Sequence, residues 1–469
     1  MRTVDVAEVI DGQKVSSYQW LIAFMAWLTL FLDGVDNQSI AYVAPALTED
    51  WGLARGALRT VFSTGVFGVA IGALFIGPLA DRYGRKLVTV LTVIYVGVLS
   101  LIVTQVSAIS ALLMPIIPAA DNLNVLAVLR FITGLGLGAV VPLGVVIVSE
   151  FAPRRRRAAM VTLMGCGYAM GAASGGFLAS YLVPAFGWES QFYIAAGLTL
   201  VMAVVLWLHL PESIRLLTIR GRTQEIATIL KRINPALAYP PDTQFVIRHE
   251  AREASANRFR PVRLFMENRA TMTVLIWLAL LMNTTVLNYL NNWLPTLAVE
   301  AGLPQVDALR ATPFLQVGGM LGVISLGFLS DRFGFFRVLM TSFALGAICI
   351  GSIGWAGPSF VLQAATIFAA GFFNIGTQIT LAALAATLYP TDIRSTGVSW
   401  AHGFARIGSI SSVMLGGTLL ALNWELHTMY YLISIPMIFG TLWILLLSTV
   451  RAKSPGGAKP ADAPSGAHA

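Results

Sequence analysis

The chain has 469 residues, of which 56% are hydrophobic and 12% are charged, and its mean hydropathy is +0.74. This composition excludes a soluble domain or a row of soluble domains and indicates a polytopic membrane protein. The formal net charge of +8 would suggest nucleic-acid binding in a soluble protein. In a membrane protein, positive charge in the loops reflects topology instead. No nucleic-acid partner is therefore expected.

The first 17 residues are polar and partly acidic, and they lack the basic region, short apolar core and small-residue cleavage site of a signal peptide. We therefore expect residues 1–17 to be a cytoplasmic segment and the first apolar run to be an uncleaved span. The two cysteines, Cys166 and Cys349, lie in apolar runs. They predict buried thiols, with neither a disulfide framework nor a metal site.

Apolar runs long enough to cross a bilayer, about 20 residues each, recur along the chain. The twelve predicted spans are 18–46, 56–80, 87–109, 124–150, 157–184, 190–210, 270–298, 307–329, 337–357, 359–388, 396–421 and 427–450. The predicted fold is an all-α polytopic membrane protein with two six-helix bundles, at 18–210 and 270–450. A basic linker at 211–269 joins the bundles, and a disordered cytoplasmic tail is expected at 451–469 because it is rich in Pro, Gly and Ala.

Two acids, Asp33 and Asp36, lie inside the first predicted span, after the apolar run WLIAFMAWLTLFL and before another apolar stretch. An ionisable group at that depth is costly unless it is paired, protonated or hydrated. The spacing places both carboxylates on one helical face, about 5 to 6 Å apart between Cβ atoms. Like charges this close favour proton binding. The pattern predicts a proton-binding centre; the alternative is that both acids only pair with basic side chains.

Basic residues are concentrated in the loops on one side of the predicted bundles. Besides the linker, these loops hold Arg82, Arg85, Lys86, Arg154 to Arg157, Arg332, Arg337 and Arg394, whereas the opposite loops hold Arg55, Arg59 and Arg310. The positive-inside rule therefore predicts that both termini and the linker are cytoplasmic. For the run 154–157 we expect a topogenic, lipid-facing role rather than a specific ligand.

The two halves repeat one another along the sequence. At an offset of 250 residues, Gly77, Leu79, Asp81, Arg82 and Gly84 match Gly327, Leu329, Asp331, Arg332 and Gly334. At an offset of 237, Gly134, Pro153, Arg157 and Gly171 match Gly371, Pro390, Arg394 and Gly408. Two parallel repeats are the arrangement of transporters that rock around a central site.

The repeat also predicts a division of labour between the halves. At the 250-residue offset Asp33 matches Asn283 and Asp36 matches Val286, so only the first half keeps the acids. The second half offers amides, hydroxyls and a phenol, which can bind a ligand by hydrogen bonds. The predicted ligand contacts in this run are Asn288, Tyr289 and Asn292.

The string Gly77-Pro-Leu-Ala-Asp81-Arg82-Tyr-Gly84-Arg85-Lys86 resembles the loop 2/3 signature of the major facilitator superfamily. Its glycines permit a tight turn between packed helices, and its charges can form an ion-pair network that holds one state and breaks in another. The second copy has Phe335-Phe336-Arg337 in place of the basic pair, so we expect a weaker latch there. The predicted gating residues are Asp81, Arg82, Gly84, Arg85, Asp331, Arg332 and Gly334.

A second string, Leu129-Arg130-Phe-Ile-Thr-Gly134-Leu-Gly136-Leu-Gly138, resembles the fourth-helix motif of the same superfamily. In that motif an arginine inside the membrane takes part in proton coupling. At about 1.5 Å of rise per residue, Arg130 reaches the depth of Asp33. We therefore expect Arg130 to pair with Asp33 or Asp36, either as part of proton coupling or as a purely structural salt bridge.

A finer resemblance covers nearly the whole chain. It is carried by Ser16 to Trp20, Leu32 to Asp36, Ile40 to Leu53, Leu210 to Ser213, Trp293 to Thr296 and Tyr389 to Trp400. These segments are similar to the aromatic acid:proton symporter family, which implies that Asp33 and Asp36 are essential for transport and that Arg406 matters in helix eleven. The sequence departs from the family pattern at Pro142-Leu143-Gly144 and at His402, near the expected cavity. The substrate of any one family member is therefore not assigned to this chain.

Arg406 is the predicted anchor for a substrate carboxylate, because a guanidinium can bind both carboxylate oxygens at once. The alternative is a purely structural role as partner of an acid or a helix end. His402, one turn away on the same face, is either a packing residue or a ligand or proton contact. Gln316, Asn374 and Gln378 are candidate contacts for ring hydroxyls, although hydrogen bonds between helices are the competing role.

The sequence thus predicts proton-coupled uptake of a small aromatic acid such as benzoate or a hydroxybenzoate, by alternating access in the bacterial inner membrane. We expect a monomer that needs the lipid bilayer and the proton gradient but no cofactor. No phosphate loop, zinc spacing or nucleophile triad points to an enzyme. The alternatives are a porter for another organic acid or a drug, and a sensor that binds the acid without transporting it.

Overall fold

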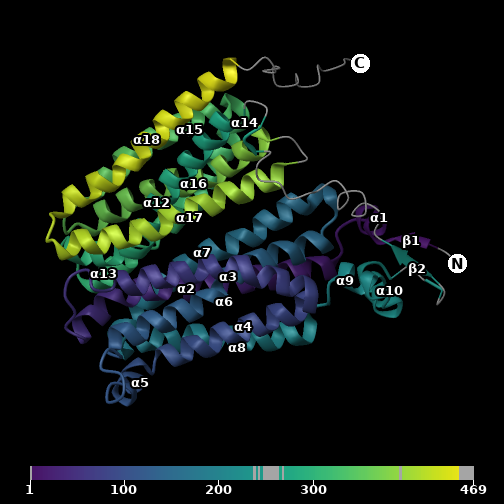
Figure 1. Ribbon diagram of the computed structural model, residues 1–469, viewed down its shortest axis with the longest axis horizontal. Coiled ribbons are helices and arrows are strands. Elements are labelled where there is room, and N and C mark those ends of the chain that lie inside the picture. The colour runs from purple at the N-terminus through teal and green to yellow at the C-terminus, as the bar shows by residue number, and fades with distance from the viewer. Residues whose placement is uncertain are drawn as a thin grey trace.

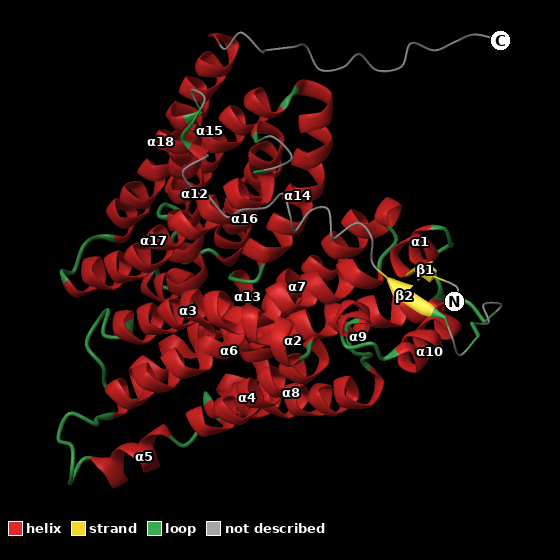
Figure 2. Ribbon diagram, turned by 45° about the vertical axis from the view of Figure 1, so that its right-hand side comes forward, coloured by secondary structure: helices red, strands yellow, loops and turns green. Residues whose placement is uncertain are grey.

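The computed structural model describes residues 3–235, 239–240, 243–246, 264–266, 269–389 and 393–453. Twelve of the helices in these ranges are long and apolar enough to cross a membrane, so the predicted twelve-span, all-α fold is confirmed. Figure 2 shows that helices make up nearly all of the molecule. Of the predicted tail at 451–469, residues 451–453 belong to the last helix, and residues 454–469 lie outside the described residues, as does the middle of the linker.

The first half consists of six long helices. They are α2 (Ser17–Asp50), α3 (Arg59–Tyr83), α4 (Arg85–Val103), α6 (Asn122–Phe151), α7 (Arg154–Phe186) and α8 (Glu189–His209). The second half repeats the pattern with α12 (Ala270–Glu300), α14 (Phe314–Phe333), α15 (Phe335–Ile353), α16 (Phe360–Leu388), α17 (Arg394–Ala421) and α18 (Leu426–Lys453). The short helices α5 (Val106–Leu113) and α13 (Gln305–Ala311) lie at one end of the bundles (Figure 1).

Two predicted spans end earlier in the structure than the sequence suggests. The third ends at Val103 rather than at 109, and a separate helix, α5, follows it. The hydroxyl of Thr104 there donates to the Leu101 carbonyl at 2.7 Å, a local bond that competes with continued helix. The ninth span ends at Ile353 rather than at 357. Hydropathy does not detect these breaks because the residues beyond them are still apolar.

The internal repeat extends to the packing of the helices. A Cβ atom added to Gly72 of α3 would lie 1.9 Å from the Leu135 carbonyl oxygen of α6, and one added to Gly322 of α14 would lie 2.0 Å from the Phe372 oxygen of α16. These pairs are related by the offsets of 250 and 237 residues seen in the sequence. In both halves, glycine is therefore needed for two helix backbones to approach closely.

The two bundles lie against each other at one end and spread apart toward the other (Figure 1). At the closed end, Arg55 forms an ion pair with Glu300, and the rings of Phe62 and Trp293 meet edge to face at 5.0 Å. The glycine at position 56 packs on the backbone of Gly417. The spread end carries α9 (Ile214–Ile219) and α10 (Thr223–Ile233) of the linker.

The N-terminal segment folds together with the linker, which the sequence did not predict. Strand β1 (Thr3–Asp5) pairs in parallel with β2 (Gln244–Val246), and α1 (Val6–Asp11) follows β1. Apolar side chains of α1, α10 and β2 are buried together. Asp11 also forms an ion pair with Arg154 at 3.4 Å, and Arg155 donates to the Gln13 carbonyl, so two arginines of the run 154–157 attach this segment to the start of α7.

Candidate functional site

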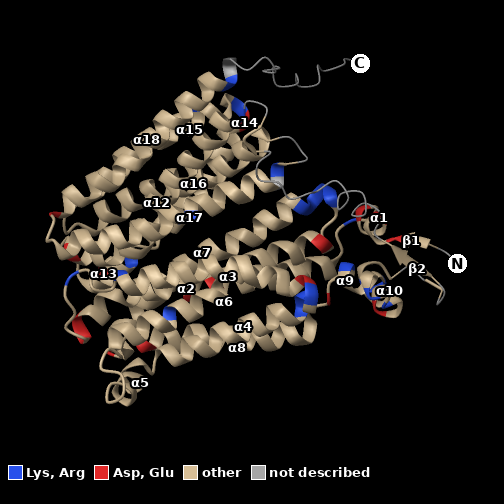
Figure 3. Cartoon of the chain, viewed as in Figure 1, with Lys and Arg blue, Asp and Glu red and all other residues tan. Residues whose placement is uncertain are grey.

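The two acids of α2 are buried inside the first half, where 6% of Asp33 and 1% of Asp36 is exposed. They are held there because α2 packs closely on α7: a Cβ atom at Gly34 would lie 2.2 Å from the Tyr168 carbonyl oxygen. Figure 3 shows that charged residues gather at the ends of the bundles and are few along the spans. The acids are thus rare charges in an apolar interior, as expected for a functional group at membrane depth.

Asp36 is held by a neighbour that the sequence analysis did not identify. The hydroxyl of Ser100, on α4, donates a hydrogen bond to Asp36 Oδ1 at 2.5 Å. The other carboxylate oxygen, Oδ2, has no hydrogen-bond partner among the described residues.

Arg130 of α6 lies at the level of the acids, as predicted, and only 3% of it is exposed. It is close enough to Asp36 for electrostatic attraction. Within the described ranges, however, no ion pair of 4.0 Å or less joins Arg130 to Asp33 or Asp36, and its Nη2 instead donates to the Asn37 carbonyl at 3.5 Å. The expected direct pairing is therefore not formed in this conformation. The Nε and Nη1 atoms of Arg130 have no partner in the described part of the chain.

Tyr168 of α7 joins this group from the other side. Its hydroxyl accepts a hydrogen bond from Asn37 Nδ2 at 2.6 Å, and it interacts electrostatically with Asp33. It also interacts electrostatically with Arg406, which belongs to the second half. Tyr168 thus lies between the acid pair and the predicted substrate anchor.

Arg406 lies on α17 with its side chain exposed, and His402, one turn before it, is half-buried. The two side chains interact electrostatically, as expected for neighbours on one helical face. Nothing in the described structure holds Arg406 in an ion pair. A guanidinium in this setting remains available to bind a carboxylate.

The predicted polar contacts of the second half form hydrogen bonds with one another. Asn283 of α12 donates to Gln378 Oε1 of α16 at 2.6 Å and to the Asn374 carbonyl at 3.1 Å. Asn374 is fully buried and donates back to Asn283 Oδ1 at 3.3 Å. Their amides therefore join α12 to α16, which is the competing role that the sequence analysis left open.

The other amides and Tyr289 are placed in similar ways. Asn288 donates to Ser409 Oγ of α17 at 3.0 Å, Asn292 donates to the Asn288 carbonyl at 2.8 Å, and Gln316 donates to Asn291 Oδ1 at 3.0 Å. Tyr289 has no exposed surface and packs inside the second half. Of the predicted substrate contacts, the structure leaves Arg406 exposed and His402, Asn288, Asn292 and Gln378 half-buried.

The loop 2/3 signature forms an ion-pair network at the spread end of the first half. Arg85 contacts the carboxylate of Glu150 on α6 and lies 3.3 Å from Asp81. The carboxylate of Glu212, which follows α8, accepts from the backbone N–H groups of Arg85 at 2.8 Å and Lys86 at 3.2 Å. Glu212 thus caps the N-terminus of α4, where negative charge is favourable. Glu212 lies within the segment from Leu210 to Ser213 that resembles the family, but the sequence alone gives no signal for this capping role.

The second copy of the signature has fewer polar contacts. Asp331 and Arg332 are exposed, and no ion pair joins them to other side chains in the described ranges. Arg332 instead lies over the ring of Phe333 at 5.4 Å. Similarly, Arg82 stacks on Tyr83 at 5.4 Å rather than joining the network of Arg85.

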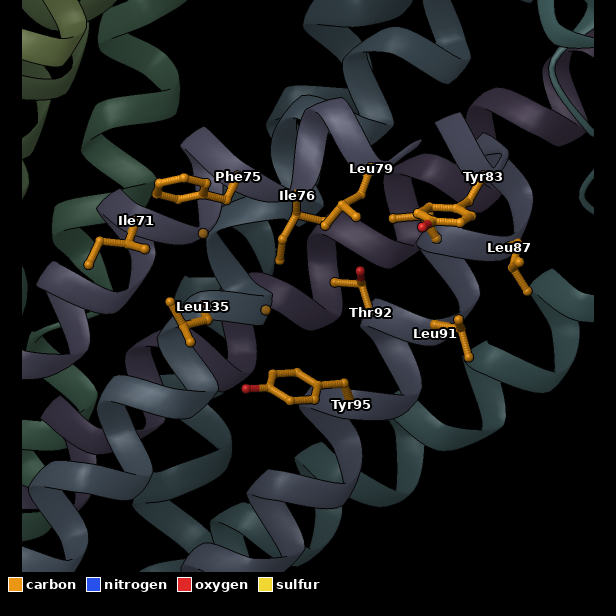
Figure 4. A pocket seen from close by; sticks show the side chains of 13 residues that line it. Ile71, Phe75, Ile76, Leu79, Tyr83, Leu87, Leu91, Thr92, Tyr95 and Leu135 are labelled. Carbon is orange, nitrogen blue, oxygen red and sulfur yellow. The ribbon is translucent and has the colours of Figure 1, made fainter. Parts of the chain in front are cut away.

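A large cavity of the described structure lies away from these residues. It has a volume of about 630 Å³ and lies between α3, α4 and α6. Figure 4 shows that its walls are mostly apolar side chains such as Phe75, Leu79 and Leu91, with Tyr95 at one end. None of the predicted substrate residues lines it, so it is not the site predicted from the sequence.

Comparison with known proteins places the chain in a family. The profile of the Major Facilitator Superfamily matches residues 26–328 and 317–467. The chain is 37% identical to the 4-hydroxybenzoate transporter PcaK of Pseudomonas aeruginosa, over 97% of this chain and 98% of that protein. It is 36% identical to the gallate transporter of Pseudomonas putida, with 96% of each chain covered. It is 32% identical to the benzoate transport protein of Acinetobacter baylyi, over 98% and 96%.

Solved structures with the same fold are more distant in sequence. A bacterial homologue of the human lysosomal transporter Spinster has a TM-score of 0.69 at 14% identity, over 94% of this chain and 100% of that one. The xylose transporter XylE of E. coli has a TM-score of 0.67 at 16% identity, over 93% and 97%. The chain belongs to the Major Facilitator Superfamily, a family of transporters rather than of enzymes, and within it to the group of the relatives named above.

Proposed function

We propose that this protein is a secondary active transporter that carries an aromatic carboxylate into the cell together with protons. The observation that carries the proposal is the arrangement of charges across the two halves. A buried acid pair and Arg130 lie in the first half, and exposed Arg406 lies in the second. Relatives named for 4-hydroxybenzoate, gallate and benzoate support an aromatic acid as the substrate.

In this proposal the protons bind at Asp33 and Asp36, and the substrate carboxylate binds at Arg406. Using different residues for the proton and for the carboxylate has a physical reason. A proton-binding group must titrate, whereas the group that binds an anion must keep its charge at every physiological pH. Tyr168 interacts electrostatically with both Asp33 and Arg406, so it lies near both the proposed proton site and the proposed substrate anchor. His402, Asn288, Asn292, Gln316, Asn374, Gln378 and Tyr289 remain candidate contacts for the rest of the substrate.

We further infer that transport proceeds by alternating access in the bacterial inner membrane, with both termini in the cytoplasm. The basic loops and the linker lie at the spread end of the bundles, and positive loops face the cytoplasm. With that orientation the two bundles spread apart toward the cytoplasm in the present conformation. Rocking of the two bundles would close the spread end and open the other. The energy source is the proton gradient, no cofactor is needed, and one chain suffices.

The proposal is tested by uptake into proteoliposomes of a panel of labelled compounds: benzoate, 4-hydroxybenzoate, gallate, an aliphatic carboxylate and benzamide. Because undissociated aromatic acids cross bilayers unaided, the rate in protein-free liposomes is subtracted. Faster protein-dependent uptake of the aromatic acids under an inside-alkaline gradient is the expected result. Binding of an aromatic acid without protein-dependent flux would identify a sensor instead, and equal uptake of the aliphatic acid would rule out aromatic specificity.

The loop 2/3 signature gives a prediction for the rocking step. Gly84 has φ +120°, and a Cβ atom there would lie 2.5 Å from Glu212 Oε2. Gly84→Ala should therefore destabilise the fold by about 1 to 3 kcal/mol and displace the carboxylate that caps α4. We expect a lower melting temperature and a transport rate reduced more than substrate binding, both measured on the same preparation.

Gly334→Ala is the matched control in the second half. Gly334 also has a positive φ, +87°, but a Cβ atom there meets no other atom within 4 Å. It should show the backbone strain without the loss of the Glu212 contact, and so transport faster than Gly84→Ala. Equal loss of transport in the two variants, or an equal loss of binding and transport in Gly84→Ala, would show that the first loop only supports folding.

A further inference from the structure

We propose that Ser100 of α4 is a positioning residue of the proton site, which stabilises the charged carboxylate of Asp36 in this conformation, where Arg130 is not paired with it. The inference rests on the proposed proton-coupled function and adds a residue that neither the sequence motifs nor the comparisons assign. It concerns how the site distinguishes a charged from a protonated Asp36.

The contact between Ser100 and Asp36 is short and fully enclosed. Ser100 Oγ donates to Asp36 Oδ1 at 2.5 Å, and 1% of each residue is exposed. A hydroxyl donating to a charged oxygen forms a stronger hydrogen bond than one donating to a neutral oxygen. The bond also crosses from α4 to α2, so it fixes the carboxylate relative to a second helix.

Ser100 differs in this respect from several other buried hydroxyls of the first half. Serine and threonine inside helices commonly donate to a carbonyl of their own helix. Thr29, Ser39, Thr133 and Ser180 do so, to the carbonyls of Met25, Val35, Leu129 and Phe177. Ser100 instead donates to an ionisable group on another helix, which indicates a role beyond satisfying its own hydroxyl.

The surrounding atoms show that Ser100 supplies a hydrogen bond to Asp36 that Arg130 does not supply in this conformation. Asp36 and Arg130 attract each other, yet Asp36 Oδ2 and the Nε and Nη1 atoms of Arg130 all lack hydrogen-bond partners within the described ranges. Buried polar groups left in this state are costly. A small movement of α4 relative to α2 and α6 would release Oδ1 and let the carboxylate pair with Arg130. In the present conformation, Ser100 is therefore the described side chain that donates a hydrogen bond to the Asp36 carboxylate.

The other groups that face Asp36 set the background for any pH effect. Asp33 lies on the same helix, and Arg130 faces it from α6. From α7 comes Tyr168, whose hydroxyl is bonded to Asn37. Helices α8 and α12 contact this stretch of α2 through Gln191 and the backbone of Asn291, neither of which titrates. Of these groups, Ser100 is the uncharged one that donates a hydrogen bond to Asp36, so its removal deletes that bond without altering any charge.

The test is the pH dependence of proton-driven 4-hydroxybenzoate uptake by full-length protein in proteoliposomes. Ser100→Ala removes a donor that favours the charged carboxylate, so Asp36 should bind its proton at lower proton concentration. We expect the midpoint of the pH profile to move toward alkaline pH by about one unit, the size of a single charge-assisted hydrogen bond. Ser100→Thr keeps the hydroxyl and should restore the wild-type midpoint.

Three further measurements make the outcome decisive. Ser180→Ala, which deletes a hydroxyl bonded only within α7, should leave the midpoint unchanged. Ser100→Cys, a weaker donor of similar size, should shift it in the same direction by less, and it serves if the alanine variant folds poorly. In an Asp36→Glu background, where the donor geometry is already altered, Ser100→Ala should have a smaller effect than in the wild type.

A uniform fall in rate at all pH values with an unmoved midpoint would overturn the inference and leave Ser100 a packing residue. If wild-type uptake itself shows no dependence on the proton gradient, it is the proposed coupling that fails. The two failures are therefore distinguishable in one experiment.

Discussion

Replacing Asp36 by asparagine is expected to abolish the protein-dependent acceleration of uptake by a proton gradient, while exchange of labelled for unlabelled substrate across the membrane continues. The amide has nearly the same shape and still accepts the hydrogen bond of Ser100, but it cannot take up and release a proton. Proton-driven uptake and exchange would be measured on the same proteoliposomes. The difference between them isolates coupling from folding and binding.

Asp33→Asn is the comparison within the same helix. Asp33 interacts electrostatically with Asp36 and Tyr168, whereas Arg130 is attracted to Asp36. We therefore expect Asp33→Asn to alter the pH profile of uptake and Asp36→Asn to remove the response to the gradient. If the proton gradient accelerates uptake by Asp36→Asn as much as uptake by the wild type, Asp36 has only a structural role.

Replacing Arg406 by lysine is expected to weaken binding of an aromatic carboxylate by about 10- to 100-fold, even though the positive charge is kept. Lysine cannot offer the planar pair of N–H donors that grips both carboxylate oxygens, and a lost hydrogen bond to a charged group costs about 1.5 to 3 kcal/mol. The measurement is equilibrium binding of benzoate and of its uncharged amide to wild type and variant. Wild type should strongly prefer benzoate.

Arg310→Lys is a useful control for this variant, because Arg310 lies on the short helix α13 at the closed end and stacks on Tyr181. It should bind benzoate like the wild type. If wild type binds benzoate and benzamide equally, or if Arg406→Lys keeps the full preference, Arg406 is not the carboxylate anchor. Arg130 then becomes the candidate to test next.

The fold was predictable because its signals extend over many residues. The twelve apolar runs, the two repeat offsets and the ten-residue loop 2/3 signature each involve many positions, so a single exceptional residue does not obscure them. The same offsets reappear in the packing of Gly72 on Leu135 and Gly322 on Phe372. The ends of the spans were less predictable, because apolar character continues past Val103 and Ile353 although the helices stop there.

The site was predictable only in part. Charges inside apolar runs are conspicuous, so Asp33, Asp36 and Arg130 were found and their common depth followed from helix geometry. Ser100 and Tyr168 were missed because a lone serine or tyrosine in a span is common, and the sequence does not show which face of α4 or α7 turns toward α2. The direct pairing of Arg130 with an acid was expected, but the position of a helix relative to its neighbours decides that contact.

Polar residues of the second half illustrate the same limit. The run from Asn283 to Asn292 indicates hydrogen bonding, but composition alone does not separate bonds to a ligand from bonds between helices. In the structure Asn283, Asn374 and Gln378 bond with one another across α12 and α16. The pairing of β1 with β2 was missed for a related reason, since two three-residue strands far apart in sequence leave no periodic signal.

The most direct test of proton-coupled transport is the pH inside proteoliposomes when 4-hydroxybenzoate is added outside in the absence of any gradient. A trapped pH-sensitive dye reports the interior, and label uptake is followed in parallel. The account predicts interior acidification faster than in protein-free liposomes and in liposomes carrying Asp36→Asn, with proton entry rising in proportion to protein-dependent uptake. Protein-dependent uptake of the label with no proton entry beyond that of the protein-free liposomes would contradict it.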